Sequence, residues 1–181
     1  DGDLDVLSSS ALDDKIAWYE NDGNENFTAH TITTGTDRPF EVKTADVDGD
    51  GDMDVVTVSQ QDNKIAWFEN DGNENFTEHI ITTAIDSAQS VDIADVDGDG
   101  DMDVLSASNN TNQITWYEND GSENFTAHII DSTNIRPTSI TTADVDGDGD
   151  LDVLSSGYLT DQITWYENDG NENFTAHTIT T

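Results

Sequence analysis

Short stretches of alternating hydrophobic and polar residues, separated by polar turns, run along the whole chain. Between residues 40 and 82 this pattern predicts four strands, at 40–45, 53–59, 64–69 and 76–82. In the third of them, Ile65 and Trp67 lie on one face, and Ala66 and Phe68 lie on the other. The turn Asn70-Asp71-Gly72-Asn73 offers the residue types that adopt positive φ in tight hairpins. No stretch has a sustained helical period, so the pattern predicts an all-β fold.

The same strand pattern recurs every 49 residues. Residues with this spacing include Trp18, Trp67, Trp116 and Trp165; Phe27, Phe76, Phe125 and Phe174; and His30, His79, His128 and His177. The units are residues 1–34, 35–83, 84–132 and 133–181, and the first lacks the part that matches residues 35–49. Self-similarity with this period indicates a repeat architecture.

Four antiparallel strands per unit is the size of a β-propeller blade. We therefore expect residues 1–181 to form a single propeller repeat domain, with three complete blades and one blade that lacks its first strand. A parallel β-helix is the alternative, but its coils are shorter and do not need hairpin turns.

Composition adds a strong electrostatic bias. The 40 acidic and 5 basic residues give a formal net charge of -35, which disfavours nucleic acids and anionic membranes as partners. The chain has no cysteine, so we expect a metal rather than disulfides to cross-link the fold. No apolar run reaches the roughly 18 residues of a membrane span. The chain opens at Asp1 without a signal peptide, and we interpret it as a mature chain or an excised piece.

An acidic loop follows the first strand of each complete unit. Residues 46–54 read D-V-D-G-D-G-D-M-D, and the pattern recurs at 95–103 and 144–152. Each close pair of carboxylates costs about 1 kcal/mol in water and about 4 kcal/mol at a protein surface. A compact turn therefore requires a cation, and Ca²⁺ fits best because it takes six to eight oxygen ligands in irregular geometry. Magnesium fits these loops less well because it prefers a regular octahedron. The alternative to a metal site is a plain polar turn exposed to solvent.

Positions 1, 3, 5 and 9 of each loop are the predicted side-chain ligands, and position 7 is predicted to offer its main-chain carbonyl. The glycine at position 6, such as Gly51, is expected to permit the sharp turn. The predicted metal residues are Asp46, Asp48, Asp50, Asp52 and Asp54; Asp95, Asp97, Asp99, Asp101 and Asp103; and Asp144, Asp146, Asp148, Asp150 and Asp152. The first unit keeps only Asp1, Asp3 and Asp5, so this fourth site is partial and we expect it to be empty or weak. Position 12 is Thr57, Ser106 or Ser155 rather than Glu, which excludes an EF-hand.

The motif D-x-D-x-D-G-x-x-D followed by a hydrophobic strand resembles the FG-GAP and VCBS-type repeats, which include the integrin α-subunit propeller. This resemblance covers essentially all 181 residues. It implies calcium binding, a propeller that commonly has seven blades, and roles in adhesion, in glycan binding, or beside secreted polysaccharide-degrading enzymes. Too few units for such a ring are present, so ring closure, further repeats elsewhere and association of copies all remain open.

Loops on the two ends of the strands differ in variability. The acidic loops and the ENDG turns share one end and barely vary, whereas the loops at the other end vary freely, which predicts a recognition surface there. The candidate ligand residues are Arg38, Arg136, Gln89, Asn109, Asn110 and Tyr158. Alternatively, the two arginines simply pair with nearby carboxylates.

Other repeated residues have structural interpretations. We expect the tryptophans to pack between blades rather than to stack on sugars, and the histidines to be structural or exposed rather than metal ligands. Candidate N-glycosylation sites are Asn26, Asn75, Asn109, Asn124 and Asn173, and Ser87 and Ser132 lie in sequences that resemble a bacterial O-glycosylation motif.

No nucleophile–base pair, phosphate loop or catalytic zinc set is recognisable, so we do not expect an enzyme. The leading hypothesis is a secreted or cell-surface adhesion module that binds a glycan or a protein. The alternatives are a self-assembling structural repeat, which would associate through the incomplete first blade, and an accessory domain of a secreted polysaccharide-degrading enzyme. Millimolar external calcium would saturate such loops, which favours an extracellular location.

Overall fold

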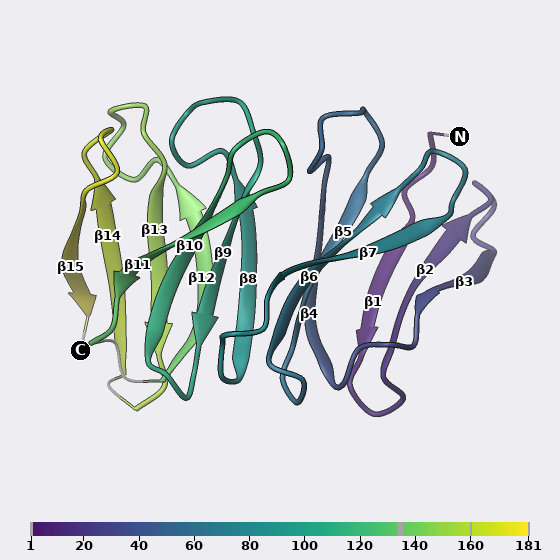
Figure 1. Cartoon of the computed structure of the whole chain (residues 1–181), viewed down its shortest axis with the longest axis horizontal. Helices are drawn as coiled ribbons and strands as arrows, with labels where there is room; N and C mark the ends of the chain where they lie inside the picture. Colours follow the sequence, from purple (N-terminus) through teal and green to yellow (C-terminus); the bar gives the residue numbers. More distant parts are fainter. Residues whose placement is uncertain (1, 134–135, 160, 181) are drawn as a thin grey trace.

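The computed structural model describes residues 2–133, 136–159 and 161–180, which form fifteen strands and no helix. The strands form four sheets, and within each sheet the strands that are consecutive in sequence pair antiparallel (Figure 1). Sheet 1 holds β1 (Val6–Ser10), β2 (Lys15–Asn21) and β3 (Phe27–Thr33). Sheet 2 holds β4 (Pro39–Ala45), β5 (Asp54–Ser59), β6 (Lys64–Asn70) and β7 (Phe76–Thr82).

The last two sheets repeat the order of sheet 2. Sheet 3 holds β8 (Ala88–Ala94), β9 (Asp103–Ser108), β10 (Gln113–Asn119) and β11 (Phe125–Asp131). Sheet 4 holds β12 (Pro137–Ala143), β13 (Asp152–Gly157), β14 (Gln162–Asn168) and β15 (Phe174–Thr180). The described residues contain no helix long and apolar enough to cross a membrane.

The predicted all-β fold is confirmed, and the predicted strands of the second unit match β4 to β7 to within one residue at each end. The hairpin turn differs in detail from the prediction. Asn70 ends β6, the turn closes with a 3.2 Å hydrogen bond from the N–H of Asp71 to the carbonyl of Asn75, and positive φ occurs at Gly72 and Glu74. The prediction missed Glu74 because glutamate is an unusual residue in the left-handed region.

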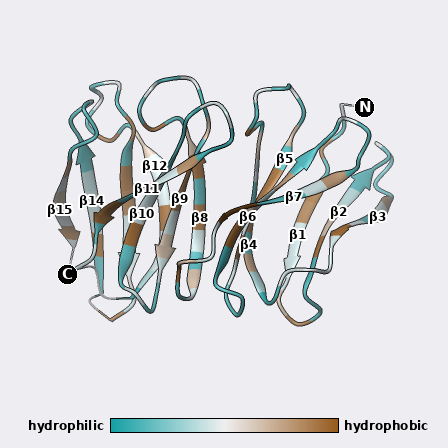
Figure 2. Ribbon diagram, viewed as in Figure 1, coloured by the Kyte–Doolittle hydropathy of each residue, from teal (hydrophilic) through white to brown (hydrophobic). Residues whose placement is uncertain are grey.

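The four sheets lie side by side in chain order, with sheet 1 near the N-terminus at one end and sheet 4 at the other (Figure 1). Hydrophobic residues gather on the strands and hydrophilic ones on the loops (Figure 2). Three buried clusters fill the spaces between neighbouring sheets: Ile16 with Phe68, Trp67 with Val104, and Trp116 with Tyr166 are examples from the three successive interfaces. Burial between sheet faces therefore holds the repeat together.

A tryptophan–histidine–glutamate stack recurs in every sheet. Trp67 and Trp116 are only 1% exposed and lie in the clusters between sheets, which confirms the packing prediction for both. His79 stacks on Trp67 with ring centroids 4.5 Å apart, and its Nε2 lies 2.7 Å from Oε2 of Glu69. The histidines thus have the structural role that the sequence predicted.

Polar contacts between neighbouring sheets also recur. The side-chain amide of Asn119 in sheet 3 donates to the carbonyl of Val47 in sheet 2 at 3.2 Å, and Asn168 in sheet 4 donates to Val96 in sheet 3 at 3.3 Å. Because these amides are buried, each bond satisfies groups that would otherwise be costly to desolvate. The end of the third strand in sheets 3 and 4 is therefore connected directly to the acidic loop of the preceding sheet.

Candidate metal centre

Each acidic loop curls around its first aspartate. In the loop between β4 and β5, Oδ2 of Asp46 accepts the N–H of Gly51 at 3.0 Å, and Oδ1 of Asp48 accepts the N–H of Asp50 at 3.1 Å. The other two loops repeat both contacts. Gly51 has φ +98°, a conformation that glycine adopts without steric cost, so the turn predicted at position 6 is confirmed.

Among the described residues, three sets of carboxylates, here called oxygen groups, could each hold a metal ion, because the oxygens within a set lie within 4.8 Å of one another. They are Asp46, Asp48 and Asp50; Asp95, Asp97 and Asp99; and Asp144, Asp146 and Asp152. Carboxylate oxygens are the ligands of hard cations such as Ca²⁺ and Mg²⁺. Positions 1 and 3 are shared by all three groups, and the third member is position 5 or position 9.

Burial, and after it the crowding of these carboxylates, disfavours their charged forms. Burial raises the pKa of Asp97, and the nearby carboxylates of Asp99 and Asp95 raise it further, although the N–H of Asp99 lowers it. Asp48 and Asp146 have raised pKa values for the same leading reason. A bound cation would relieve this repulsion.

Position 9 has a structural role that the sequence did not predict. Asp103 is 0% exposed; its Oδ1 accepts the N–H of Asn119 at 2.8 Å, and its Oδ2 accepts the N–H of Val96 at 3.0 Å. Asp54 and Asp152 make the matching pair of bonds. Burial raises the pKa of Asp103 to about 6. Position 9 therefore ties the acidic loop to the end of the third strand, and only in the last loop does it join an oxygen group.

Position 7 turns its carboxylate toward the hairpin turn of its own sheet. The carboxylate of Asp101 lies against Gly121, Asp52 lies against Gly72, and Asp150 lies against Gly170. None of these three carboxylates belongs to an oxygen group. This orientation leaves the main-chain carbonyl as the predicted ligand at position 7.

We expect Gly121→Ala to lower the free energy of unfolding by about 2–3 kcal/mol. The alanine has to keep the positive φ of Gly121, and its methyl group overlaps the Asp101 carboxylate. Gly98→Ala is the matched control, since Gly98 has φ +77° against +69° for Gly121 but has open space around it. Urea denaturation of both variants in excess calcium measures the difference. Equal losses in the two variants would contradict a role for the Asp101 contact.

The first unit keeps part of this arrangement. Asp1 lies outside the described residues, so its predicted role stays a prediction. Asp5 accepts the N–H of Asn21 at 2.8 Å, as position 9 does elsewhere, and Asp3 lies against Gly23, as position 7 does. The described residues of this unit form no group of three oxygens.

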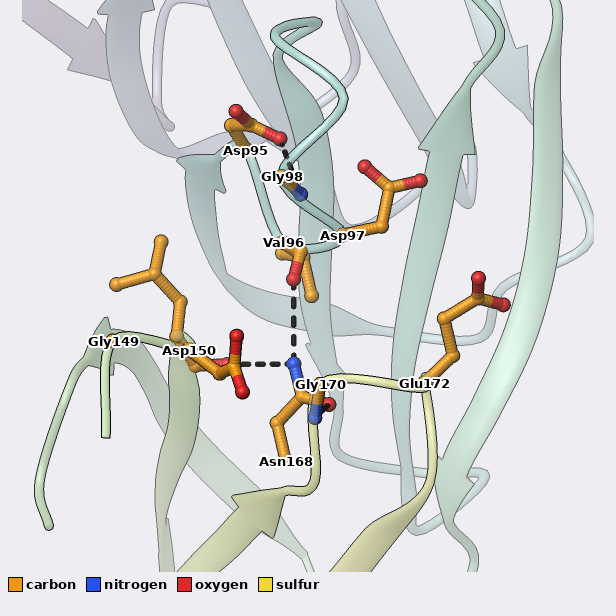
Figure 3. Close-up of a pocket in the computed structure, with 10 residues that line it drawn as sticks. Asp95, Val96, Asp97, Gly98, Gly149, Asp150, Asn168, Gly170 and Glu172 are labelled. Atoms are coloured by element: carbon orange, nitrogen blue, oxygen red, sulfur yellow. Dashed lines mark hydrogen bonds between the residues drawn. The ribbon is translucent and has the colours of Figure 1, made fainter.

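A cleft opens where neighbouring acidic loops meet. Asp95 and Asp97 of sheet 3 face Asp150 and Glu172 of sheet 4 across it (Figure 3). The Asn168 amide bridges the cleft, donating to the carbonyl of Val96 and to that of Leu151 at 3.2 Å. The loops of sheets 3 and 4 therefore share a wall of main-chain and carboxylate oxygens.

The predicted variable surface lies at the opposite strand ends. Nε of Arg136 donates to Oδ1 of Asn109 at 2.9 Å, and its guanidinium lies 5.9 Å from the ring centroid of Tyr158. Asn110 donates to Oδ1 of Asp86 at 3.0 Å. The structure thus brings together three of the predicted residues, at the boundary of sheets 3 and 4.

The remaining predicted residues lie apart from that group. The N–H of Arg38 donates to Oδ1 of Asp14, between sheets 1 and 2, and Gln89 lies on β8. Neither arginine forms an ion pair with a described residue, so the interpretation that both pair with carboxylates is wrong for this part of the chain. Both have positive φ, 58° and 55°, which the sequence did not suggest.

The candidate glycosylation residues stay predictions. Four of the five asparagines lie in hairpin turns, where each amide donates to the aspartate four residues before it: Asn26, Asn75, Asn124 and Asn173. Asn109 is only 3% exposed, and Ser87 has φ 57°. Ser132 is exposed.

Fold and loops together define an all-β repeat protein with an acidic loop beside each complete sheet. The model of the FG-GAP-like repeat matches residues 1–57, 46–106 and 95–155. The chain therefore belongs to the FG-GAP-like repeat family. No curated protein sequence matches it.

Several solved structures share this fold at low sequence identity. A lectin from Agrocybe aegerita, described as recognising non-reducing terminal N-acetylglucosamine, is 16% identical with a TM-score of 0.61, over 96% of this chain and 52% of the lectin. A protein of unknown function from Desulfotomaculum acetoxidans is 15% identical with a TM-score of 0.64, over 97% and 50%. An exo-β-1,3-galactanase from Phanerochaete chrysosporium is 13% identical with a TM-score of 0.59, over 94% and 44%. The chain thus spans about half the length of these structures.

Proposed function

We propose that the four sheets are blades of a β-propeller, stabilised by calcium, that acts outside the cell as a non-catalytic binding module for glycans. The oxygen groups of the three complete loops support the calcium part of the proposal. The acidic composition and the millimolar calcium of extracellular fluids support the location.

The observation that carries the binding proposal is the group formed by Arg136, Asn109 and Tyr158. Arg136 and Tyr158 are exposed, and Asn109 is buried beneath them with its Oδ1 fixed by the arginine. An aromatic ring beside a planar array of N–H donors offers a stacking face and hydrogen bonds, which are the contacts that a sugar ring requires.

Electrostatics also favour this group of residues as the ligand site. The chain has two arginines among 40 acidic residues, so an exposed guanidinium without a carboxylate partner among the described residues is an unusual feature of its surface. With its Nε engaged by Asn109, this guanidinium keeps further N–H donors that can bind hydroxyl and carboxylate oxygens. Neutral or acidic sugars are therefore the favoured ligand class.

We expect Arg136→Ala to reduce binding on a glycan array by at least tenfold, because it removes the donors and releases Asn109. Arg38→Ala is the matched control, because Arg38 occupies the same place in an earlier repeat but has no comparable partners. Surface plasmon resonance with the best array sugar measures both affinities. If Arg136→Ala binds as tightly as the unmodified chain, or if no sugar binds at all, the proposal is wrong.

A further inference from the structure

The two outermost sheet faces of the chain carry the same residues that are buried at the internal interfaces. On the outer face of sheet 4, Ile163 is 42% exposed, whereas its repeat equivalents Ile114 and Ile65 are 0% exposed. Ile179 is 55% exposed, whereas its equivalents Ile130 and Ile81 pack against the clusters between sheets. This face thus exposes isoleucines at two of the positions by which sheets 2 and 3 hold their next neighbour.

The outer face of sheet 1 is the complementary surface. Val6 is 49% exposed, whereas its equivalent Val55 is 3% exposed and Val104 is fully buried. Phe27 is 52% exposed, whereas its equivalents Phe125 and Phe174 pack against the preceding sheet. Sheet 1 therefore presents the surface by which sheets 2, 3 and 4 dock on the sheet before them.

We propose that a second copy of this chain docks head to tail, with the outer face of its sheet 1 on the outer face of sheet 4. The internal interfaces supply the register. Trp116 and Phe174 meet edge to face with centroids 6.5 Å apart, and one repeat further the same pair is Trp165 with Phe27 of the second copy. The contact is heterologous, because it joins two different faces.

A polar contact between sheets can be extended to the second copy in the same way. Asn168 donates to the carbonyl of Val96, and one repeat further the same bond joins Asn21 of the second copy to Val145. Val145 is 44% exposed, whereas Val96 and Val47 are 4% and 3% exposed. The exposed Val145 is therefore a further part of the surface that the preceding repeats bury against their next sheet.

The length of the related structures is in accord with two copies. The chain covers 52% of the Agrocybe lectin and 50% of the Desulfotomaculum protein, so two copies would supply the length of one such chain. Sheet 1 lacks an innermost strand equivalent to β8, whose Ala88 and Val91 are buried in the interface of sheets 2 and 3. Because this strand is absent from the contact, and because each copy carries a charge of -35, we expect the association to be reversible and to strengthen with calcium and salt.

Sedimentation velocity of the 181-residue chain in calcium and about 0.5 M NaCl tests the proposal, since that ionic strength largely screens the charge. We expect the average mass to rise at least twofold with concentration. Ile163→Glu and Val6→Glu should each abolish self-association, and Ile129→Glu, which alters a 60% exposed isoleucine on an internal sheet, should not.

Mixing the two inactive variants gives the decisive result. Each keeps the face that the other has lost, so an equimolar mixture of Ile163→Glu and Val6→Glu should form a one-to-one complex. Circular dichroism confirms that each variant is folded. A chain that stays monomeric at all concentrations, or one whose assembly survives either variant alone, overturns the proposal.

Discussion

Calcium should raise the melting temperature of the chain by roughly 20 °C relative to the chain in excess chelator. The three complete loops hold clustered carboxylates whose repulsion a divalent ion would remove. A site filled to 100 times its dissociation constant contributes about 2.7 kcal/mol, so three sites contribute about 8 kcal/mol. For a domain of this size, 1 kcal/mol corresponds to about 2–4 °C. Differential scanning calorimetry with calcium and with EGTA measures the shift.

Magnesium and stoichiometry provide the controls for this expectation. The same concentration of Mg²⁺ should give a much smaller shift, because the irregular loops do not offer an octahedral set of ligands. Isothermal titration calorimetry should find three calcium ions per chain, and Asp97→Asn should remove one of them. An equal shift with Mg²⁺ would indicate general screening of the -35 charge instead.

Hydrophobic patterning was sufficient to predict the strands. The 49-residue period and the alternation in residues 64–69 predicted β6 with Ile65 and Trp67 on one face, and the structure buries both against sheet 3. The period was informative because each unit has to bury the same face against the next one. The same positions are therefore hydrophobic in every repeat. Positions within the acidic loops were predicted equally well where a glycine was required, as at Gly51.

The sequence did not reveal how the aspartates divide their roles. Asp48 and Asp54 look alike in a list of carboxylates, but Asp48 joins an oxygen group and Asp54 binds two backbone N–H groups. Partners sixteen residues away decide this difference, and local spacing contains no information about them. One signal was available: the asparagine at the end of each third strand, such as Asn70, recurs with the same period as the aspartate whose oxygen accepts its N–H.

Asp103→Ala should lower the free energy of unfolding by about 3–5 kcal/mol, whether or not calcium is present. The substitution leaves the N–H groups of Asn119 and Val96 without acceptors at a fully buried position, and each such loss costs about 1–3 kcal/mol. It also removes the link between the acidic loop of sheet 3 and Asn119, the last residue of β10. Urea denaturation with calcium and with chelator measures both values.

Asp97→Asn is the matched control, because Asp97 lies in the same loop and its carboxylate belongs to an oxygen group rather than to the buried pair of bonds. An amide keeps an oxygen that accepts the N–H of Asp99 but loses the charge that attracts the ion. Asp97→Asn should therefore be destabilising in calcium and neutral, or slightly stabilising, in chelator, where it relieves repulsion. If Asp103→Ala follows the same pattern and is harmless without calcium, then position 9 acts through the metal alone, and the structural role assigned to its two hydrogen bonds is wrong.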